Sequence, residues 1–348
     1  MSCLVSTMSL SNGFRLKKKN LMLRMITAYP PSKKSRFRNI KIITYFLLWI
    51  SIVGRIIGFY RIKKKSYTFL DAYLKTNSNI EKFSIRDTNS QYYSIYECED
   101  GIYEPDVACT MKSILKKGNQ FLDVGANWGH HTIFAAKVCN ARVISIEPNP
   151  DVFEDLSRTI KELGVADKVK SINVALGDKN SRMFLEQHYY DSGVGSINKD
   201  FSKWMEESLI YEKRMKRLLK IKSINYPIMC KKLDDININN NMVLWKVDVE
   251  GEESKVIKGA LITLRRNRPF LILEFHNKLE NNFKDYRKTI ESENYIVYEI
   301  KSMQLTKGKH SVTYEEIGKG QFPTSRYGNV LAVPAEKLNY LKELLNDN

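Results

Sequence analysis

Apolar and polar positions follow two alternating periods over most of the chain after residue 119, with short apolar runs separated by stretches of helical spacing. The apolar runs predict seven strands, at 120–124, 142–147, 169–174, 243–249, 270–275, 294–300 and 329–333. The helical stretches lie at 130–139, 150–163, 253–266 and 282–292. This alternation is typical of a mostly parallel sheet with helices on both faces, so we expect an α/β fold. The seventh strand follows a long loop without a clear helix and is expected to run antiparallel.

Segments on either side of this alternation define the remaining organisation. Residues 66–103 form a lead-in with short strands expected around Phe83–Ile85 and Tyr92–Tyr96. A helix is expected from Glu104 to Leu115, with Pro105 in its first turn. We therefore expect one main domain at 104–334, followed by a C-terminal helix or tail at 335–348.

One stretch, residues 188–229, interrupts the pattern as an insertion. It contains an expected helix, Phe201–Lys222, with six lysines and arginines near its end. Such a run is typical of a solvated charged face. The alternatives are a lid over the acceptor site or a contact with anionic lipid or glycan.

The net charge of +17 is concentrated in the N-terminal tail. Residues 1–65 hold 15 lysines and arginines and no acid, whereas the remainder has 41 basic and 39 acidic residues. The globular part is therefore nearly neutral, which argues against a nucleic-acid enzyme. An anionic membrane surface is the partner expected for the tail.

Within the tail, Ile42–Tyr60 is a run of 19 mostly apolar residues with one charge, Arg55, between basic clusters. Its length fits a single membrane span, and its flanks also fit an interfacial helix. A targeting segment and a buried helix remain open. Basic flanks on both sides leave the orientation undetermined. The five cysteines form no Cys-x-x-Cys pair, and no glycosylation sequon is present, which favours a catalytic domain facing the cytosol.

The first strand leads into a glycine-interrupted turn, Asp123-Val-Gly125-Ala-Asn127-Trp-Gly129, and the second ends at Glu147. A strand, a glycine turn, a helix and a strand ending in an acid are typical of a Rossmann-like half that binds an adenosine-bearing cofactor. Here the glycines are four residues apart, unlike the dinucleotide fingerprint, and Asp123 is poorly placed beside a pyrophosphate. An acid there suits a ligand with an ammonium group, such as S-adenosylmethionine.

Ionisable residues also follow the fourth and fifth strands, where ligands bind in open α/β sheets. Strand period places Lys246, Asp248 and Glu250 on one side, and the fifth strand ends with Glu274 and His276. A hydroxyl acceptor must lose a proton, so we expect Asp248 or His276 to act as base. Glu250 and Glu274 would then orient the acceptor.

Other interpretations of these ionisable residues, and of the two histidines after Gly129, remain open. Asp248, Glu250 and Glu274 offer oxygen ligands that suit Mg²⁺, although the sequence does not require a metal. In a purely structural interpretation, Glu250 caps the helix that starts at Gly251, and Lys246 forms an ion pair with an acid. His130 and His131 point in different directions on a helix, so we expect them to line the cofactor cleft or contact solvent.

Six runs together resemble the FkbM-type S-adenosylmethionine-dependent methyltransferases, over about residues 103–334. They are Tyr103-Glu-Pro, Asp123-Val-Gly-Ala-Asn-x-Gly129, Glu147-Pro-x-Pro150, Asn173-x-Ala-Leu-Gly-Asp178, Lys246-x-Asp-Val-Glu-Gly251 and Ile272-Leu-Glu-Phe-His276. The resemblance implies a Rossmann-like class I methyltransferase fold with a seven-stranded, mostly parallel sheet.

The same resemblance implies roles for individual residues. Asp123, Gly125, Asn127 and Gly129 would line the methionine side of the cofactor, Glu147 the ribose and Asp178 the region of the adenine. Because relatives mostly methylate oxygen on sugars or natural products, the favoured acceptor is a sugar hydroxyl on a glycan, glycolipid or related metabolite. The alternatives are a protein N-methyltransferase and a non-catalytic, membrane-tethered adaptor.

Overall fold

A computed structural model describes residues 2–4, 64, 68–75, 80–86, 103–187, 195–197, 224–238, 241–306 and 309–346. The expected elements Ile42–Tyr60, Tyr92–Tyr96 and Phe201–Lys222 lie outside these ranges. Within them, no helix combines the length and apolar character that a membrane crossing requires.

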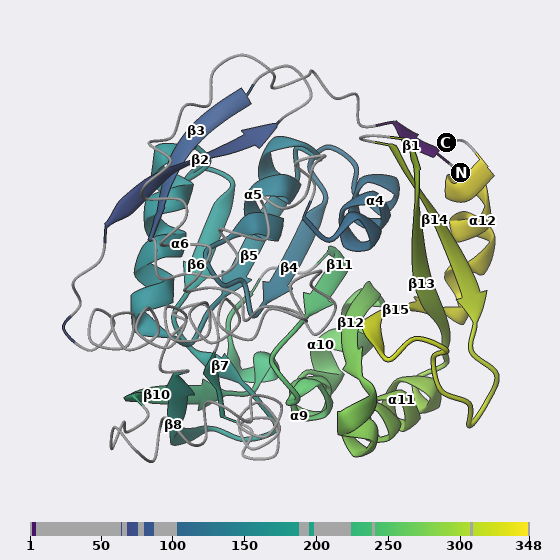
Figure 1. Cartoon of the computed structure of the whole chain (residues 1–348). Helices are drawn as coiled ribbons and strands as arrows, with labels where there is room; N and C mark the ends of the chain where they lie inside the picture. The colour runs from purple at the N-terminus through teal and green to yellow at the C-terminus, as the bar shows by residue number, and fades with distance from the viewer. Residues whose placement is uncertain are drawn as a thin grey trace, which may run out of the picture.

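The centre of the fold is a nine-stranded sheet in the order β1-β14-β13-β15-β12-β11-β4-β5-β6 (Figure 1). The strands are β1 (Ser2–Leu4), β4 (Gln120–Val124), β5 (Arg142–Ile146), β6 (Val169–Ile172), β11 (Met242–Val247), β12 (Phe270–His276), β13 (Tyr295–Thr306), β14 (Lys309–Glu316) and β15 (Tyr327–Pro334). The seven predicted strands occupy adjacent positions from β6 to β13. From β6 to β12 the pairs are parallel, and β15 runs antiparallel to β12, as expected.

Helices cover both faces of this sheet, as the apolar strands predicted. One face packs against α4 (Pro105–Ile114), α5 (His130–Lys137) and α6 (Pro150–Glu162), and the other against α9 (Glu253–Lys258), α10 (Leu261–Asn267) and α11 (Glu280–Ser292). The chain ends in α12 (Leu338–Asn346). Neighbouring strand residues separate between the two cores, Phe121 to the first and Leu122 to the second.

The single helix predicted at 253–266 is wrong, because the chain forms two helices, α9 and α10, interrupted at Gly259. A Cβ atom on Gly259 would lie 1.9 Å from the carbonyl oxygen of Gly177. The backbones therefore approach too closely there for any other residue. This contact fixes the strand β7 (Ala175–Leu176) beside the helices.

A second sheet, in the order β7-β10-β8-β9, was not predicted. It adds β8 (Ser181–Gln187), β9 (Gly195–Ser196) and β10 (Ile224–Lys231) to β7. Parts of the expected insertion 188–229 thus form strands. A separate hairpin of β2 (Phe69–Lys75) and β3 (Ile80–Arg86) lies along α6, in the position expected for the lead-in (Figure 1).

Candidate active site

The turn after β4 has an unusual backbone that only small or amide residues adopt readily. Gly125, Asn127 and Gly129 all have positive φ, at 82°, 52° and 101°. A Cβ on Gly125 would lie 1.8 Å from the carbonyl oxygen of Asp248, and one on Gly129 would lie 2.6 Å from a methyl carbon of Leu156. The glycines therefore let the turn pack directly against the end of β11 and against α6.

Glu147, directly after β5, stabilises this turn through hydrogen bonds to its backbone. Its carboxylate accepts hydrogen bonds from the backbone N–H groups of Asn127, at 2.9 Å, and Asn149, at 2.8 Å. Burial raises the pKa of Glu147 to about 7, although the two N–H donors oppose the shift. Asn149 then caps α6 by accepting from the N–H groups of Asp151 and Val152. A single acid thus links the glycine turn to the start of α6.

A cleft of about 780 Å³, counted to its open mouth, lies beside these groups. Gly125, Asn127 and Glu147 form one wall, and Asp248 and Glu250 lie on another. The remaining lining is largely apolar and includes Val152, Val174, Leu176 and, from the unpredicted second sheet and the residue after it, Leu185, Gly195, Ser196 and Ile197.

Asp123 lies beneath the glycine turn rather than in the cleft lining, and its side chain is almost completely buried. One carboxylate oxygen, Oδ2, accepts a 2.6 Å hydrogen bond from the Thr132 hydroxyl. The other, Oδ1, has no hydrogen-bond partner within the part of the chain that the structure describes. Burial raises the pKa of Asp123 to about 6, and the nearby Lys246 ammonium opposes that shift. The predicted position of Asp123 in the lining of the methionine side is therefore not observed.

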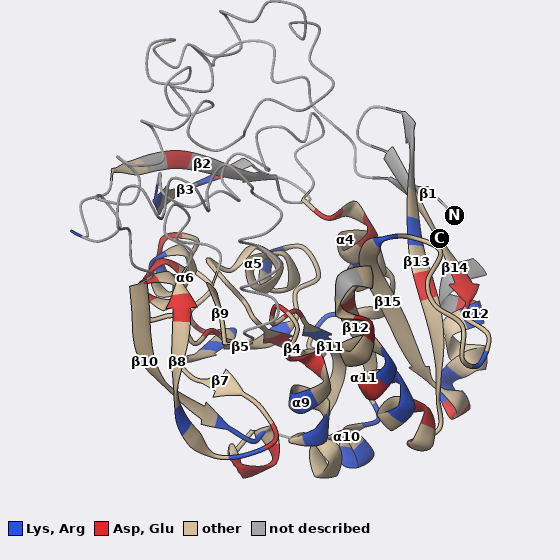
Figure 2. Ribbon diagram, turned by 60° about the horizontal axis from the view of Figure 1, so that its bottom comes forward, with Lys and Arg blue, Asp and Glu red and all other residues tan. Residues whose placement is uncertain are grey.

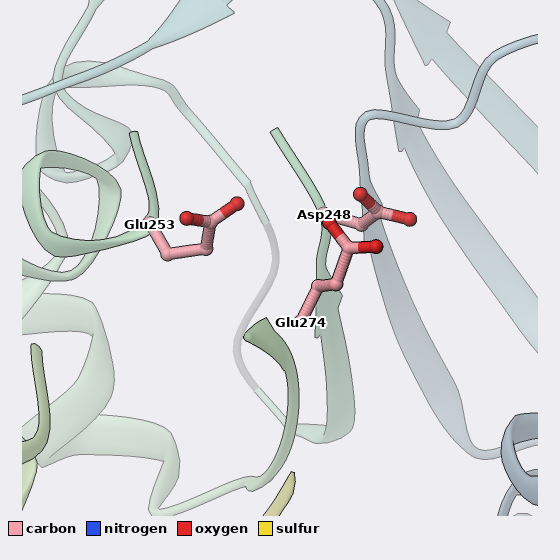
Figure 3. Close-up of side chains that lie close together, drawn as sticks. All are labelled: Asp248, Glu253 and Glu274. Carbon is pink, nitrogen blue, oxygen red and sulfur yellow. The ribbon is translucent and has the colours of Figure 1, made fainter. Parts of the chain in front are cut away.

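Three carboxylates gather where β11 and β12 end: Asp248, Glu253 and Glu274 (Figure 3). Each offers one oxygen, and these oxygens lie within 4.8 Å of one another. Burial raises the pKa of Glu274 well above its usual value, and the neighbouring acids raise it further, Asp248 most strongly. Acidic residues are concentrated at this rim of the sheet in Figure 2.

The metal set expected from the sequence contained Glu250, but Glu253 takes its place beside Asp248 and Glu274. Glu250 has a left-handed backbone, with φ 55°, and lines the cleft. The capping role suggested for Glu250 is also wrong. The helix begins at Glu253, whose carboxylate accepts from the N–H groups of Val249 and Gly251. Burial raises the pKa of Glu253 to about 7.

Lys246 is buried and sits between acids, as the structural interpretation suggested. Its ammonium nitrogen lies 2.6 Å from Asp248 Oδ2 and 4.0 Å from Glu104 Oε2. Burial lowers the pKa of Lys246, but Asp248, Glu104 and Asp123 outweigh this effect and raise it well above its usual value. The ammonium therefore stays charged at neutral pH.

His130 and His131 are both buried and lie outside the cleft lining, so the expected cleft or solvent contact is not observed. Nε2 of His131 lies 2.8 Å from the Glu104 carboxylate. Burial lowers the pKa of His130 to about 3 and that of His131 well below its usual value. Both imidazoles are therefore neutral. Sequence reasoning gave Glu104 no role, although its position just before Pro105, at the start of α4, marked it as a helix boundary.

Five predicted site residues are not part of the cleft lining: Asp123, Gly129, Asp178, Glu274 and His276. Asp178 is exposed in the loop after β7 and is not part of the lining. His276 ends β12, where it pairs in register with Tyr327 and stacks on its ring at 6.4 Å. His276 lies two residues beyond Glu274 on the same strand, so both belong to the carboxyl rim.

Comparison with known proteins identifies a methyltransferase domain in the chain. Residues 123–297, half of the chain, match the methyltransferase FkbM domain. A relative, the protein-L-isoaspartate O-methyltransferase of Methanococcus maripaludis, is 29% identical over 150 residues, which are 41% of this chain and 66% of that protein. The chain thus spans just under two thirds of this relative's length.

Solved structures similar to the chain include two methyltransferases. The methyltransferase FkbM of Methylobacillus flagellatus is 15% identical, with a TM-score of 0.37, and the match covers 81% of this chain and 59% of that one. The O-methyltransferase of Bacillus cereus in complex with SAH is 11% identical, with a TM-score of 0.36 and coverage of 70% and 87%.

Proposed function

Because the chain belongs to the FkbM methyltransferase family, we propose that it transfers the methyl group of S-adenosylmethionine to a sugar hydroxyl on a glycan, glycolipid or related metabolite. The observation that carries the cofactor assignment is the buried Glu147 carboxylate, which forms a wall of the cleft and fastens the glycine turn. Each of its oxygens accepts one backbone N–H and has a second lone pair for a ribose hydroxyl.

The groups beside Glu147 fit the rest of this cofactor. Apolar side chains of Val174 and Leu176 line the cleft, where they can pack against a base. Gly125 and Asn127 also line the cleft and would face the methionine part of the cofactor. When bound, S-adenosylmethionine supplies a methyl group on a sulfonium sulfur, and the sulfur leaves in line with the incoming acceptor oxygen. Positioning therefore contributes much of the rate.

In this proposal Asp248 receives the proton of the acceptor hydroxyl. It lies in the cleft lining, and its Oδ2 is 2.6 Å from the Lys246 ammonium nitrogen. A positioned general base typically contributes ~10²–10⁴-fold to a rate. Glu250 and Glu274 orient the acceptor, and His276 is the second candidate base at the same rim.

Mass spectrometry of glycan and glycolipid mixtures incubated with S-adenosylmethionine tests this function. We expect an O-methylated product, heavier by one CH2 unit because the methyl group replaces the hydroxyl proton, formed with and without a chelator. Asp248→Asn should lower kcat about 100-fold or more, and His276→Asn much less. Methylation of protein side chains alone, or equal rates for Asp248→Asn and the parent, would contradict the assignment.

The basic tail supports a location for this activity at an anionic membrane surface. Residues 1–65 contain no acid, whereas the remainder is nearly neutral. Each lysine or arginine near an anionic membrane contributes about 1 kcal/mol of attraction. The apolar segment Ile42–Tyr60 would add burial in the bilayer, and a glycolipid acceptor would then meet the domain there.

A further inference from the structure

The strand β3 contacts two segments that carry residues of the proposed cofactor cleft, although it belongs to neither of the larger sheets. It pairs with β2 and lies along α6 (Figure 1). The first segment is the glycine turn between β4 and α5, and the second is α6, where Val152 and the preceding Asn149 line the cleft. The contacts are made by side chains that are spaced along β3.

The first contact is an aromatic stack behind the glycine turn. Phe83 lies over Trp128, with ring centroids 5.4 Å apart and planes inclined by only 14°. Both side chains are almost fully buried. Trp128 follows Asn127 in the turn, and the backbone N–H of Trp128 donates to the side-chain oxygen of Asn127. Phe83 therefore packs against the residue next to a cleft-lining amide.

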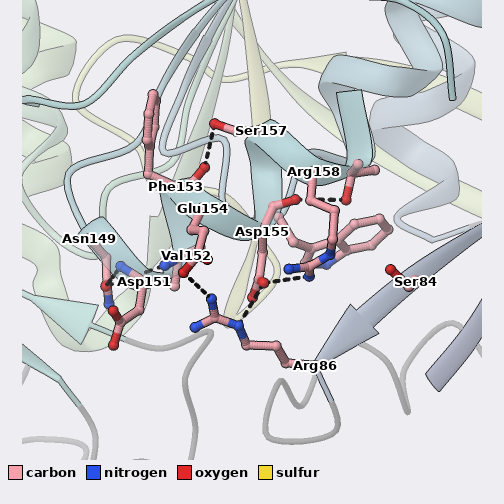
Figure 4. A network of polar contacts seen from close by, with 12 residues as sticks. Ser84, Arg86, Asn149, Asp151, Val152, Phe153, Glu154, Asp155, Ser157 and Arg158 are labelled. Atoms are coloured by element: carbon pink, nitrogen blue, oxygen red, sulfur yellow. Dashed lines mark hydrogen bonds and ion pairs between the residues drawn. The ribbon is translucent and has the colours of Figure 1, made fainter. Parts of the chain in front are cut away.

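The second contact is a set of ion pairs and hydrogen bonds to α6 (Figure 4). Arg86 is 1% exposed, and its guanidinium lies 2.7 Å from Asp155 and 2.6 Å from Glu154. The N–H and hydroxyl of Ser84 both donate to the Glu162 carboxylate at 2.6 Å. Figure 4 shows Arg86 reaching from β3 toward Glu154 and Asp155, with Asn149 at the beginning of the same helix.

A third contact involves α5, where Glu81 of β3 lies 2.7 Å from Lys137. One strand thus joins the turn, the helix that follows it and the helix that begins beside Glu147. The turn carries three residues with positive φ, and such a backbone persists only when its surroundings hold it.

We propose that β3 is a positioning element of the cofactor site, in which Phe83 and Arg86 hold the glycine turn and α6 at the separation that S-adenosylmethionine requires. The inference rests on the proposed function, since it concerns the same cleft. Neither residue touches the cofactor in this proposal. Both act through the walls that do, Phe83 through Trp128 and Arg86 through Asp155.

Calorimetric titration of the full chain with S-adenosylhomocysteine tests the role of Phe83. Phe83→Leu keeps an apolar side chain at the site but removes the stack, and we expect binding about three- to tenfold weaker, in line with the typical strength of aromatic pairs. The control is Leu341→Ala on α12, which belongs to the same apolar core but lies far from β3. It should lower Tm at least as much while leaving affinity within about twofold.

Arg86 provides a second test that does not depend on the stack. Arg86→Met should weaken binding of S-adenosylhomocysteine at a temperature well below its Tm, and Arg86→Lys, which keeps the charge but cannot contact Asp155 and Glu154 through two nitrogens, should restore only part of it. Parent-like affinity in both Phe83→Leu and Arg86→Met would overturn the inference. So would an affinity loss in Leu341→Ala as large as theirs, because the effect would then follow stability alone. Absence of binding by the folded parent would instead contradict the proposed function.

Discussion

The Lys246 ammonium nitrogen lies 2.6 Å from Asp248 Oδ2 in a position where the lysine is 2% exposed. The same ammonium opposes the raised pKa of Asp123, under the glycine turn, and lies 4.0 Å from Glu104. One buried cation therefore compensates acids from three segments of the chain that are far apart in sequence. The lysine connects the proposed base with the proposed cofactor turn.

Removal of this cation should destabilise the domain strongly. Lys246→Met leaves the buried Asp123 and the partly buried Asp248 and Glu104 without their cation, and breaking a buried pair typically costs about 3–5 kcal/mol. Urea denaturation measures the loss. Lys284→Met is the control, because Lys284 lies 3.4 Å from Glu280 and both side chains are more than half exposed, so its loss should cost less than about 1 kcal/mol. Equal stabilities of the two variants would contradict the compensating role of Lys246.

Stability should rise as the pH falls from 8 to 6. Burial raises the folded-state pKa of Glu147 and Glu253 to about 7 and of Asp123 and Asp155 to about 6. A raised carboxyl binds its proton more readily in the folded state, so its contribution is complete below its unfolded pKa and disappears as the pH rises through the folded value. We expect Tm to be higher at pH 6 than at pH 8.

Glu147→Gln checks the assignment of that pH effect. The variant has no proton to gain, so its stability should change less between pH 8 and pH 6, by about 1 kcal/mol relative to the parent. Denaturation curves at the two pH values give the difference directly. The lowered pKa values of His130 and His131 act in the opposite direction, so a parent whose stability falls over this range would show that the raised carboxyls do not outweigh the histidines.

Gly125→Ala should be far more damaging than an equivalent change in an open turn. The new methyl group would meet the Asp248 carbonyl oxygen at 1.8 Å, so the turn or the end of β11 must move. Gly118→Ala is matched, because Gly118 also has φ +82° but a Cβ added there would meet no heavy atom of the described residues within 4 Å. We expect about 1 kcal/mol for the control, and a larger loss together with lost cofactor binding for Gly125→Ala.

Deletion of residues 1–65 should abolish attachment to anionic vesicles. Without its tail the protein carries a net charge of only +2, so little electrostatic attraction remains. Sedimentation with vesicles that contain an anionic lipid, in low and high salt, measures the effect. If the shortened protein still sediments, the contact lies elsewhere, and the basic stretch Lys213–Lys222 becomes the first segment to replace.

The seven core strands could be predicted because each contributes apolar side chains to both cores of a covered sheet. The second sheet could not, since its strands are buried on one side only. β10 contains Pro227 and β8 exposes Phe184, at 69%, and both features weaken a strand pattern. The polar strand β14 was missed for a similar reason: it lies near one end of the sheet.

The candidate site was predicted in outline, and its errors have a physical cause. The period-two argument for Lys246, Asp248 and Glu250 requires a continuous strand, but β11 ends at Val247 and Glu250 has positive φ. Glu253 then joins Asp248 and Glu274 from the first turn of α9. An acid two residues after Gly251, where it can accept free backbone N–H groups at a helix start, was the available signal.

Calorimetric titration with S-adenosylmethionine of the parent and of Glu147→Gln tests the central claim most directly. We predict that the parent binds and that the variant binds more weakly, by about 1–3 kcal/mol if the ionised carboxylate accepts from the ribose. Equal affinities would contradict the ribose assignment of Glu147. Absence of binding by the folded parent would contradict the cofactor itself.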